Sequence, residues 1–398
     1  MHYVGENVQF STPRQLTPAN GKHHFFGYYG ICPWDATGRY FICLETDFQD
    51  HMPRIGEKAG ILLMDLRTGE SKLIAETNAW NFQQGAMLNW LPSDAGHKIV
   101  FNDCDATRAW SRVLDVVTGE ERALPMPIYA MARHHDLAAC INFGRLRKNR
   151  RVTSIPFGID KNKDVVHPAD DGIYMMDART GDAKLVITLD DVWKANADTL
   201  SLDDELLADA GIQFWIEHVA FNHSDTRIHF LARFTDLFRS LVTAMWTCNV
   251  DGTDLHLAVP YYLRISHFEW IDDKELVVTM SWPDKKHLSH VQLADKVGQG
   301  SWRVIAADKL VVDGHPHVSP DKRLMATDTY VIDGKRRVYV VERDTETLHE
   351  VAAFDNPPEI NGDIRCDPHP RWNRDGSQLC FDGLGERGRQ VYVLDVSP

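Results

Sequence analysis

Paired cysteines, long apolar runs and basic clusters are scarce in this chain of 398 residues. Its seven cysteines are scattered and lack CxxC spacing, which fits reduced thiols better than a disulfide framework. No stretch approaches the ~18 apolar residues of a membrane span, and no signal peptide is visible. At a formal net charge of −14, nothing resembles the basic stripe of a nucleic-acid-binding protein. We therefore expect a cytoplasmic protein whose partners include neither nucleic acid nor a membrane.

One segment departs from this acidic composition. GRLRKNRR at 144–151 holds five basic residues in eight. It is either a solvated loop or an anion-facing patch on an otherwise acidic protein.

An internal repeat is the strongest signal in the sequence. Apolar residues make up 43% and aromatics 10% of the chain, enough for a sizeable core. Strands ending in Asp-x-x-Thr-Gly recur, as in ILLMDLRTGESKLI (61–74), and each reads as a hairpin. A second type of hairpin precedes each of these, and its seven copies have the apolar anchors Trp34, Trp90, Met131, Phe221, Trp270, Val318 and Trp372.

The spacing of the anchors predicts the architecture. Successive anchors lie 56, 41, 90, 49, 48 and 54 residues apart, which is about the length of one propeller blade. The long gap contains a predicted helical insertion near 187–212. The last repeat ends after its third strand, and the N-terminal segment around RQLTP (14–18) is expected to supply the missing strand. The sequence thus predicts an all-β fold, a seven-bladed β-propeller forming a single domain over residues 1–398.

Histidine recurs at one position of this repeat. Three residues before the anchor, four consecutive blades carry His218, His267, His315 and His369. Equivalent positions on the first strands of a propeller form a ring around the channel, so these imidazoles are expected to converge. Such a cluster suits a first-row metal, with Cys366, Asp367 or His317 nearby in sequence. The alternative is that each histidine caps its turn or hydrogen-bonds between blades.

Several of these motifs resemble those of the propeller polysaccharide lyases, namely oligogalacturonate lyase and the ulvan lyases. The resemblance covers nearly the whole chain and rests on GKHHFFGYYGICPWDATGRY, SHFEW, DGHPHVSPD and DIRCDPHPRWNRDGSQLCFDG. It implies a metal held by His267 and His369. Two ligands of the family fall on Asp367 and Ile364 here, so we expect His315 and Cys366 to replace them, with His218 nearby. A cysteine ligand favours zinc; without it, manganese or calcium remain open.

The ulvan lyases imply a second set of residues. They use a tyrosine followed sixteen residues later by an arginine, and Tyr129 and Arg145 have that spacing here. Where a family histidine is expected near FQQGAMLNW, this chain has Gln84. The other family histidine could correspond to His51, His23 or His24. We expect catalysis by the residues Tyr129, Arg145, His51 and Gln84, and substrate binding by His23, His24, Tyr28 and Arg233.

The implied activity is a carbon–oxygen lyase that cleaves a glycan containing uronic acid by β-elimination. In such a reaction a cation neutralises the carboxylate, a base removes the C5 proton and an acid protonates the departing oxygen. Arg145 would suit the first task, and Tyr129 the other two if positive charge lowered its pKa. The aromatic run FFGYYG (25–30) could stack on sugar rings or be core. The alternatives are a non-catalytic scaffold resembling TolB and a metal-dependent glycan hydrolase.

Overall fold

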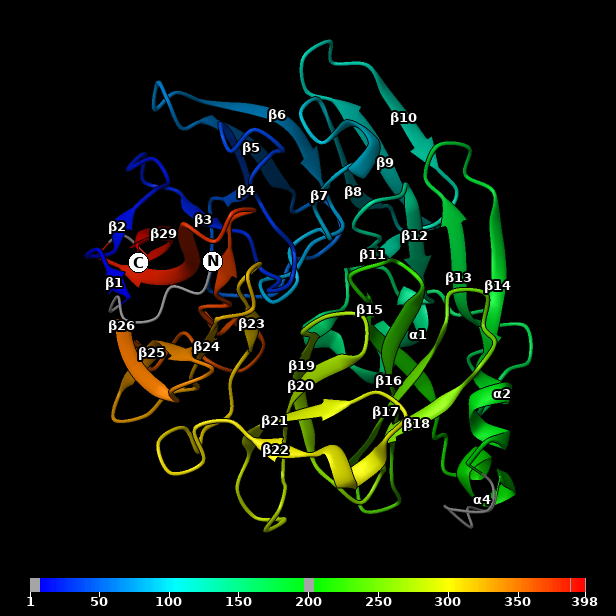
Figure 1. The fold of residues 1–398 in the computed structure, drawn as a ribbon. Coiled ribbons are helices and arrows are strands. Elements are labelled where there is room, and N and C mark those ends of the chain that lie inside the picture. The colour runs from blue at the N-terminus through cyan, green and yellow to red at the C-terminus, as the bar shows by residue number, and fades with distance from the viewer. Residues whose placement is uncertain (1–7, 197–203, 387, 398) are drawn as a thin grey trace.

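The strands are arranged as a ring of sheets around a central channel. A computed structural model describes residues 8–196, 204–386 and 388–397. Within these residues the strands form seven sheets (Figure 1), which confirms the predicted seven-bladed β-propeller. Among the same residues, no helix is long and apolar enough to cross a membrane.

Six blades consist of four strands that follow one another in the chain and pair antiparallel. Blades 1 to 3 contain β3 (His23–Phe25), β4 (Tyr40–Thr46), β5 (Ala59–Asp65), β6 (Ser71–Thr77); β7 (Asn89–Trp90), β8 (Lys98–Cys104), β9 (Ala109–Asp115), β10 (Glu121–Leu124); and β11 (Ile128–Met131), β12 (Leu137–Cys140), β13 (Gly172–Asp177), β14 (Ala183–Thr188). Blades 4 to 6 contain β15 (Trp215–Phe221), β16 (Arg227–Thr235), β17 (Leu241–Asn249), β18 (His256–Val259); β19 (Ile265–Trp270), β20 (Glu275–Met280), β21 (Ser289–Ala294), β22 (Arg303–Val304); and β23 (His317–Val318), β24 (Leu324–Asp328), β25 (Lys335–Glu342), β26 (Thr347–Asp355).

The seventh blade joins the two ends of the chain. It contains β27 (Arg371–Trp372), β28 (Gln378–Gly385) and β29 (Gly388–Ser397), and β29 pairs with both β1 (Gln9–Phe10) and β2 (Arg14–Gln15). In Figure 1 the blue N-terminal strands accordingly lie beside the red β29. The predicted closure by the N-terminal segment is therefore confirmed.

The recurring Asp-x-x-Thr-Gly forms the turn between the third and fourth strands of a blade. After β5, the Asp65 carboxylate accepts the backbone N–H of Arg67 at 2.9 Å, and Gly69 donates its N–H to the Asp65 carbonyl at 2.8 Å. Gly69 has φ +76°, a left-handed conformation that glycine adopts without steric cost. Gly119 and Gly181 occupy the same place with φ +78° and +85°, so the motif acts through its turn chemistry.

Three of the four tryptophan anchors fasten neighbouring blades together; the indole N–H of the fourth, Trp34, has no hydrogen-bond partner among the described residues. The indole N–H of Trp90 donates to the carbonyl of Pro33 in the preceding blade at 2.9 Å. Trp372 donates in the same way to His317 at 2.9 Å, and Trp270 to Ala220 at 3.3 Å. Each ring is at most 4% exposed. Burial and a satisfied donor together explain why a large indole stands at these positions.

The 90-residue gap between two anchors contains two excursions. The predicted insertion near 187–212 includes α2 (Leu189–Lys194), which begins with a capping box between Thr188 and Asp191, and α4 (Asp204–Asp209). Residues 197–203 of that insertion lie outside the described residues. The basic segment 144–151 is mostly helical rather than a loop, because α1 (Phe143–Asn149) is capped by Asn142, whose side chain accepts the N–H of Arg145.

The FFGYYG run crosses the channel and is clamped there from two sides. Gly27 has φ +98°, and a Cβ at this position would lie 2.3 Å from the backbone nitrogen of Gly85. The N–H groups of Phe26 and Gly27 donate to the two carboxylate oxygens of Asp382 at 3.2 and 3.0 Å. Asp382 is itself held by Arg371 at 2.6 Å. The run therefore forms a fixed partition inside the ring.

Candidate functional site

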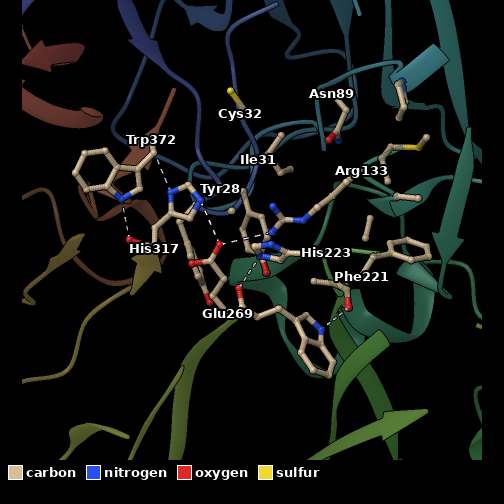
Figure 2. A pocket seen from close by; sticks show the side chains of 18 of the residues that line it. Tyr28, Ile31, Cys32, Asn89, Arg133, Phe221, His223, Glu269, His317 and Trp372 are labelled. Carbon is tan, nitrogen blue, oxygen red and sulfur yellow. Dashed lines mark hydrogen bonds and ion pairs between the residues drawn. The ribbon is translucent and has the colours of Figure 1, made fainter. Parts of the chain in front are cut away.

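Two chambers occupy opposite ends of the channel. On β19, residues Ile265 to His267 line one cavity of about 250 Å³, while the next residues, Phe268 to Trp270, line another of about 460 Å³. Tyr28 and Tyr29 line both cavities and separate them. We call the smaller cavity, which contains the repeated histidines, the histidine chamber. The larger one, around Trp90, Trp270 and Trp372, is the aromatic chamber (Figure 2).

The structure brings the four repeated histidines into one place. His218, His267, His315 and His369 all line the histidine chamber and are at most 8% exposed. The rings of His267 and His315 have centroids 3.6 Å apart, and those of His315 and His369 are 4.0 Å apart. His218 stands apart from these three, 6.1 Å from the ring of Tyr28. The expected convergence is thus observed, as a cluster of three plus one.

Part of this cluster can hold a metal ion. One ligand atom each from His315, Asp367 and His369 lies within 4.8 Å of the other two, and all three residues are buried. Burial lowers the pKa of both imidazoles well below its usual value, so both are neutral with a free electron pair. Although burial opposes ionisation, Arg365 and Arg336 keep the pKa of Asp367 low. Two neutral imidazoles and a carboxylate are suitable ligands for a divalent cation.

Carboxylates on the far side of the rings orient these imidazoles. Asp328 Oδ1 lies 2.8 Å from His315 Nδ1, and its Oδ2 accepts the backbone N–H of His369 at 2.8 Å. Asp313 lies 3.2 Å from His267 Nδ1 in the same way. A carboxylate behind the ring is typical of metal-binding histidines, because it fixes the tautomer and turns the other nitrogen toward the ion. Nδ1 of His369 is buried without a hydrogen-bond partner, which a cation would satisfy.

The predicted cysteine ligand is not part of this group. Cys366 is buried, but in the described residues its sulfur does not belong to the group formed by His315, Asp367 and His369. Burial raises the pKa of this thiol to about 11, so it is not a ready thiolate. The neighbouring Asp367 supplies the ligand atom instead. Without a thiolate, the observation that would favour zinc is missing.

His218 combines a neutral ring with an adjacent carboxylate. Glu217 Oε2 lies 3.2 Å from His218 Nδ1 as an ion-pair contact, although this nitrogen has no partner in hydrogen-bonding geometry. The adjacent negative charge favours a proton on Nδ1 and leaves Nε2, 3.5 Å from the Gln84 amide, as the acceptor. Burial lowers the pKa of His218 to about 4. The residue has φ +56°, as His369 has φ +47°. Such backbone in residues other than glycine costs about 1–3 kcal/mol, which the surrounding structure must offset.

Three arginines add positive charge to the histidine chamber. Arg233, a predicted substrate-binding residue, pairs with Glu217 and donates to Thr243 at 3.1 Å. Arg365 donates to Asp367 at 2.6 Å. Arg150 is less committed, since its Nε has no hydrogen-bond partner and lies 3.9 Å from Glu217. Of the three, Arg150 is the guanidinium most available to an anionic ligand, with its side chain 35% exposed.

Arg145 lies elsewhere, which corrects its expected role. Its guanidinium donates to the backbone carbonyls of Phe214, Asn162, Val165 and Val166 and pairs with Asp160 at 3.3 Å. Since the residue is 1% exposed, its donors are consumed in holding the loop after α1. An arginine so placed stabilises the fold and has no donor to offer a substrate carboxylate.

Tyr129 and Gln84 form a contact between the two chambers. The Tyr129 hydroxyl accepts the amide N–H of Gln84 at 2.7 Å, and Gln84 lies 3.5 Å from His218 Nε2. Burial raises the pKa of Tyr129 well above its usual value, the opposite of what its expected role as a base requires. Tyr28, predicted to bind substrate, lines the histidine chamber from the partition.

The remaining predicted histidines lie outside both chambers. His51 is held by Asp50 and Glu57 and stacks on Phe48 with ring centroids 4.1 Å apart. His24 is fully buried between Gln390 and Glu45, each at 3.0 Å. His23, on the same strand β3, is half-buried beside Gly388. These positions do not support the roles in catalysis and binding that were expected.

Sequence reasoning missed several residues of the histidine chamber. Arg150 belongs to the basic run 144–151, for which an anion-facing patch was one interpretation, so a signal existed. Asp367 was not missed, because the sequence analysis names it with Cys366 and His317 as a possible further ligand. Asp313 and Asp328 gave no signal, because their role depends on which imidazoles lie beside them in space.

Comparison with known proteins supports the architecture. No family model matches the chain, and no curated protein sequence does. Among solved structures, oligogalacturonate lyase from Vibrio parahaemolyticus has a TM-score of 0.65 at 13% identity, covering 98% of this chain and 96% of its own. An oligogalacturonate lyase in complex with manganese has a TM-score of 0.67 at 17% identity with the same coverage. A prolyl endopeptidase structure has a TM-score of 0.56 at 12% identity, over 94% of this chain and 50% of that one. At these identities the likeness shows that the chain has the fold of these propellers.

Proposed function

We propose that the protein is a lyase that cleaves a uronic-acid-containing oligosaccharide by β-elimination in the histidine chamber. The observation that carries this proposal is the combination found there. A neutral histidine with a carboxylate behind it, a cation-binding group and an available guanidinium surround one cavity of about 250 Å³. The two oligogalacturonate lyases of the same fold support the choice of reaction.

Arg150 is the residue that would bind the uronate carboxylate. Its Nε is unpaired in a partly exposed side chain, and a guanidinium fork matches a carboxylate in two hydrogen bonds. Arg233 and Arg365 keep their own carboxylate partners and add positive potential. Neutralising the substrate carboxylate makes the adjacent C5–H bond more acidic.

His218 is the proposed base. With Nδ1 beside Glu217, Nε2 accepts the C5 proton, the C4–C5 double bond forms and the C4–O bond breaks. Glu217 stabilises the resulting imidazolium, which returns its proton to the departing oxygen. Atoms and charge then balance without water. A low pKa keeps His218 unprotonated at neutral pH, as the first step requires.

A divalent metal fits the group formed by His315, Asp367 and His369, with His267 adjacent. The orphaned Nδ1 of His369 and the carboxylates behind His267 and His315 support this assignment. When bound, such an ion would supply Lewis-acid polarisation of a substrate oxygen. The solved relative in complex with manganese makes manganese the first ion to test.

The product distinguishes this reaction from its alternatives. Incubation with oligomers of galacturonate, glucuronate and mannuronate, with manganese added, should give the ultraviolet absorbance of an unsaturated uronate. New reducing ends without that absorbance would indicate a hydrolase, and neither signal with any oligomer would favour a scaffold.

A matched pair of variants then locates the reaction. Arg150→Ala should raise KM because the carboxylate loses a partner in the ground state, and should lower kcat because this contact strengthens as negative charge develops on the carboxylate in the transition state. Arg145→Ala should act mainly through stability. Equal KM values for wild type and Arg150→Ala would contradict the assignment.

A further inference from the structure

The aromatic chamber, at the end of the channel opposite the proposed active site, has the features of a second ligand site. Its volume of about 460 Å³ is within the range of small-molecule pockets. Its walls include Trp90, Phe221, Trp270 and Trp372. Figure 2 shows Trp372, His317, Glu269 and Arg133 one after another along its wall.

The walls offer apolar faces rather than hydrogen bonds. The indole N–H groups of Trp90, Trp270 and Trp372 already donate to backbone carbonyls of neighbouring blades. They therefore present only ring surface to a ligand. An aromatic ring would find surfaces on which to pack between these indoles.

The mouth carries positive charge. Arg133 and Arg374 are basic, and Glu269 is the only acidic residue among the described residues that line the chamber. Arg133 lies 3.8 Å from Glu269 Oε1, beyond hydrogen-bonding distance, and its side chain is 39% exposed. The carboxylate of Glu269 is already engaged by the N–H of Val318 at 2.6 Å and by His317 at 3.2 Å. The guanidinium of Arg133 can thus bind a further anion.

A second, independent feature is an unsatisfied imidazole. His229 lines the chamber and is 1% exposed, yet both its ring nitrogens are buried without a hydrogen-bond partner. Its ring instead lies 4.6 Å from that of Phe268. Buried polar atoms are rarely left unpaired in folded proteins. A neutral imidazole offers one donor and one acceptor, and one hydroxyl group can satisfy either.

From these observations we propose that the aromatic chamber binds a small hydroxyaryl carboxylate. Its carboxylate pairs with Arg133, its ring packs between the tryptophans, and its hydroxyl group hydrogen-bonds to His229. This site is separate from the proposed lyase centre and does not depend on that function.

Calorimetric titration of the full-length protein with 4-hydroxyphenylacetate tests the site. Binding is expected, and at least tenfold weaker binding is expected for the neutral amide of the same compound. Arg133→Gln should weaken binding of the acid by at least tenfold. Ile31→Trp, which places an indole in the chamber, should abolish it, with circular dichroism confirming the fold of both variants. Arg179→Ala, at an exposed arginine whose guanidinium pairs with Asp177, should bind like the wild type. No binding to wild type, or unchanged binding to both chamber variants, would overturn the proposal.

The hydroxyl contact has its own test. Phenylacetate should bind the wild type at least tenfold more weakly than 4-hydroxyphenylacetate, and this difference should disappear in His229→Phe. A difference that persists in the variant would overturn the role of His229.

Competition distinguishes this site from the proposed lyase centre. Saturating galacturonate or removal of metal with a chelator should leave binding of the aromatic acid unchanged. Displacement by galacturonate would mean that both compounds bind in the histidine chamber, and the proposal would fail while the lyase proposal stood.

Discussion

Histidine is buried in two opposite ways in this protein: with a carboxylate beside the ring, as also at His317 next to Glu269, or with no partner at all. In the histidine chamber, Asp328 and Asp313 stand behind the rings of His315 and His267. In the aromatic chamber, His229 has no partner for either nitrogen. A carboxylate behind a ring fixes its tautomer and leaves the other nitrogen free to bind a proton or a metal. A buried imidazole without such a partner can offer a ligand only a hydrogen bond. The difference shows that the surroundings of a histidine, more than its burial, indicate its chemistry.

The largest expected effect is on catalysis in the histidine chamber. His218→Asn keeps a residue that tolerates a positive φ but removes the proposed base, so kcat should fall by about 10²- to 10⁴-fold. Initial rates of ultraviolet absorbance measure this on the best substrate. His287→Asn, at an exposed surface histidine, is the control. Turnover within tenfold of wild type would assign the base elsewhere, while binding in the aromatic chamber should be unaffected.

Truncating Tyr29, which separates the two chambers, should lower the stability of the fold. Tyr29 is 3% exposed, contacts three of the chamber histidines and accepts the N–H of Phe268 at 3.2 Å. Tyr29→Ala should lower the free energy of unfolding by about 3–5 kcal/mol, measured by denaturant titration. Tyr29→Phe, which loses only the hydroxyl group, should cost about 0.5–1.5 kcal/mol. Equal costs would mean that the ring contributes little.

Metal affinity should depend on the carboxylate behind the cluster. Asp328→Asn weakens the support of His315 without removing a ligand, so the affinity for manganese should fall by about 10- to 100-fold. Calorimetric titration of metal-free protein measures this, with exposed Asp344→Asn as control. Unchanged affinity would place the ion away from His315.

The smallest effect is on the pH dependence of stability. Burial lowers the pKa of His229 to about 3, against about 6.5 in the unfolded chain. Below pH ~6.5 the unfolded state binds the extra proton, so the contribution of this group is complete above that pH and is lost as pH falls toward 3. Between pH 7 and pH 5, the free energy of unfolding of His229→Phe should therefore fall by about 1–2 kcal/mol less than that of the wild type. Parallel pH profiles for the two proteins would indicate that His229 protonates normally in the folded state.

The sequence by itself determined the ring and the placement of histidines within it. Turn chemistry such as Asp65-x-x-Thr-Gly69 is local, and a large apolar anchor must be buried whichever blade contains it. Because each blade repeats the same arrangement, counting three residues back from Trp270 or Trp372 placed His267 and His369 at equivalent positions of one ring around the channel.

Only the tertiary structure decided what those positions do. The spacing of Tyr129 and Arg145 suggested a catalytic pair, yet backbone carbonyls from an excursion inside the third blade bind the guanidinium of Arg145. Asp367 rather than Cys366 joins the metal group, and Glu217 and Asp328 select which imidazole nitrogens stay free. These outcomes depend on distances of about 3 Å between residues far apart in the chain, since hydrogen bonds and ion pairs act only at contact. No periodicity in a single sequence encodes such contacts.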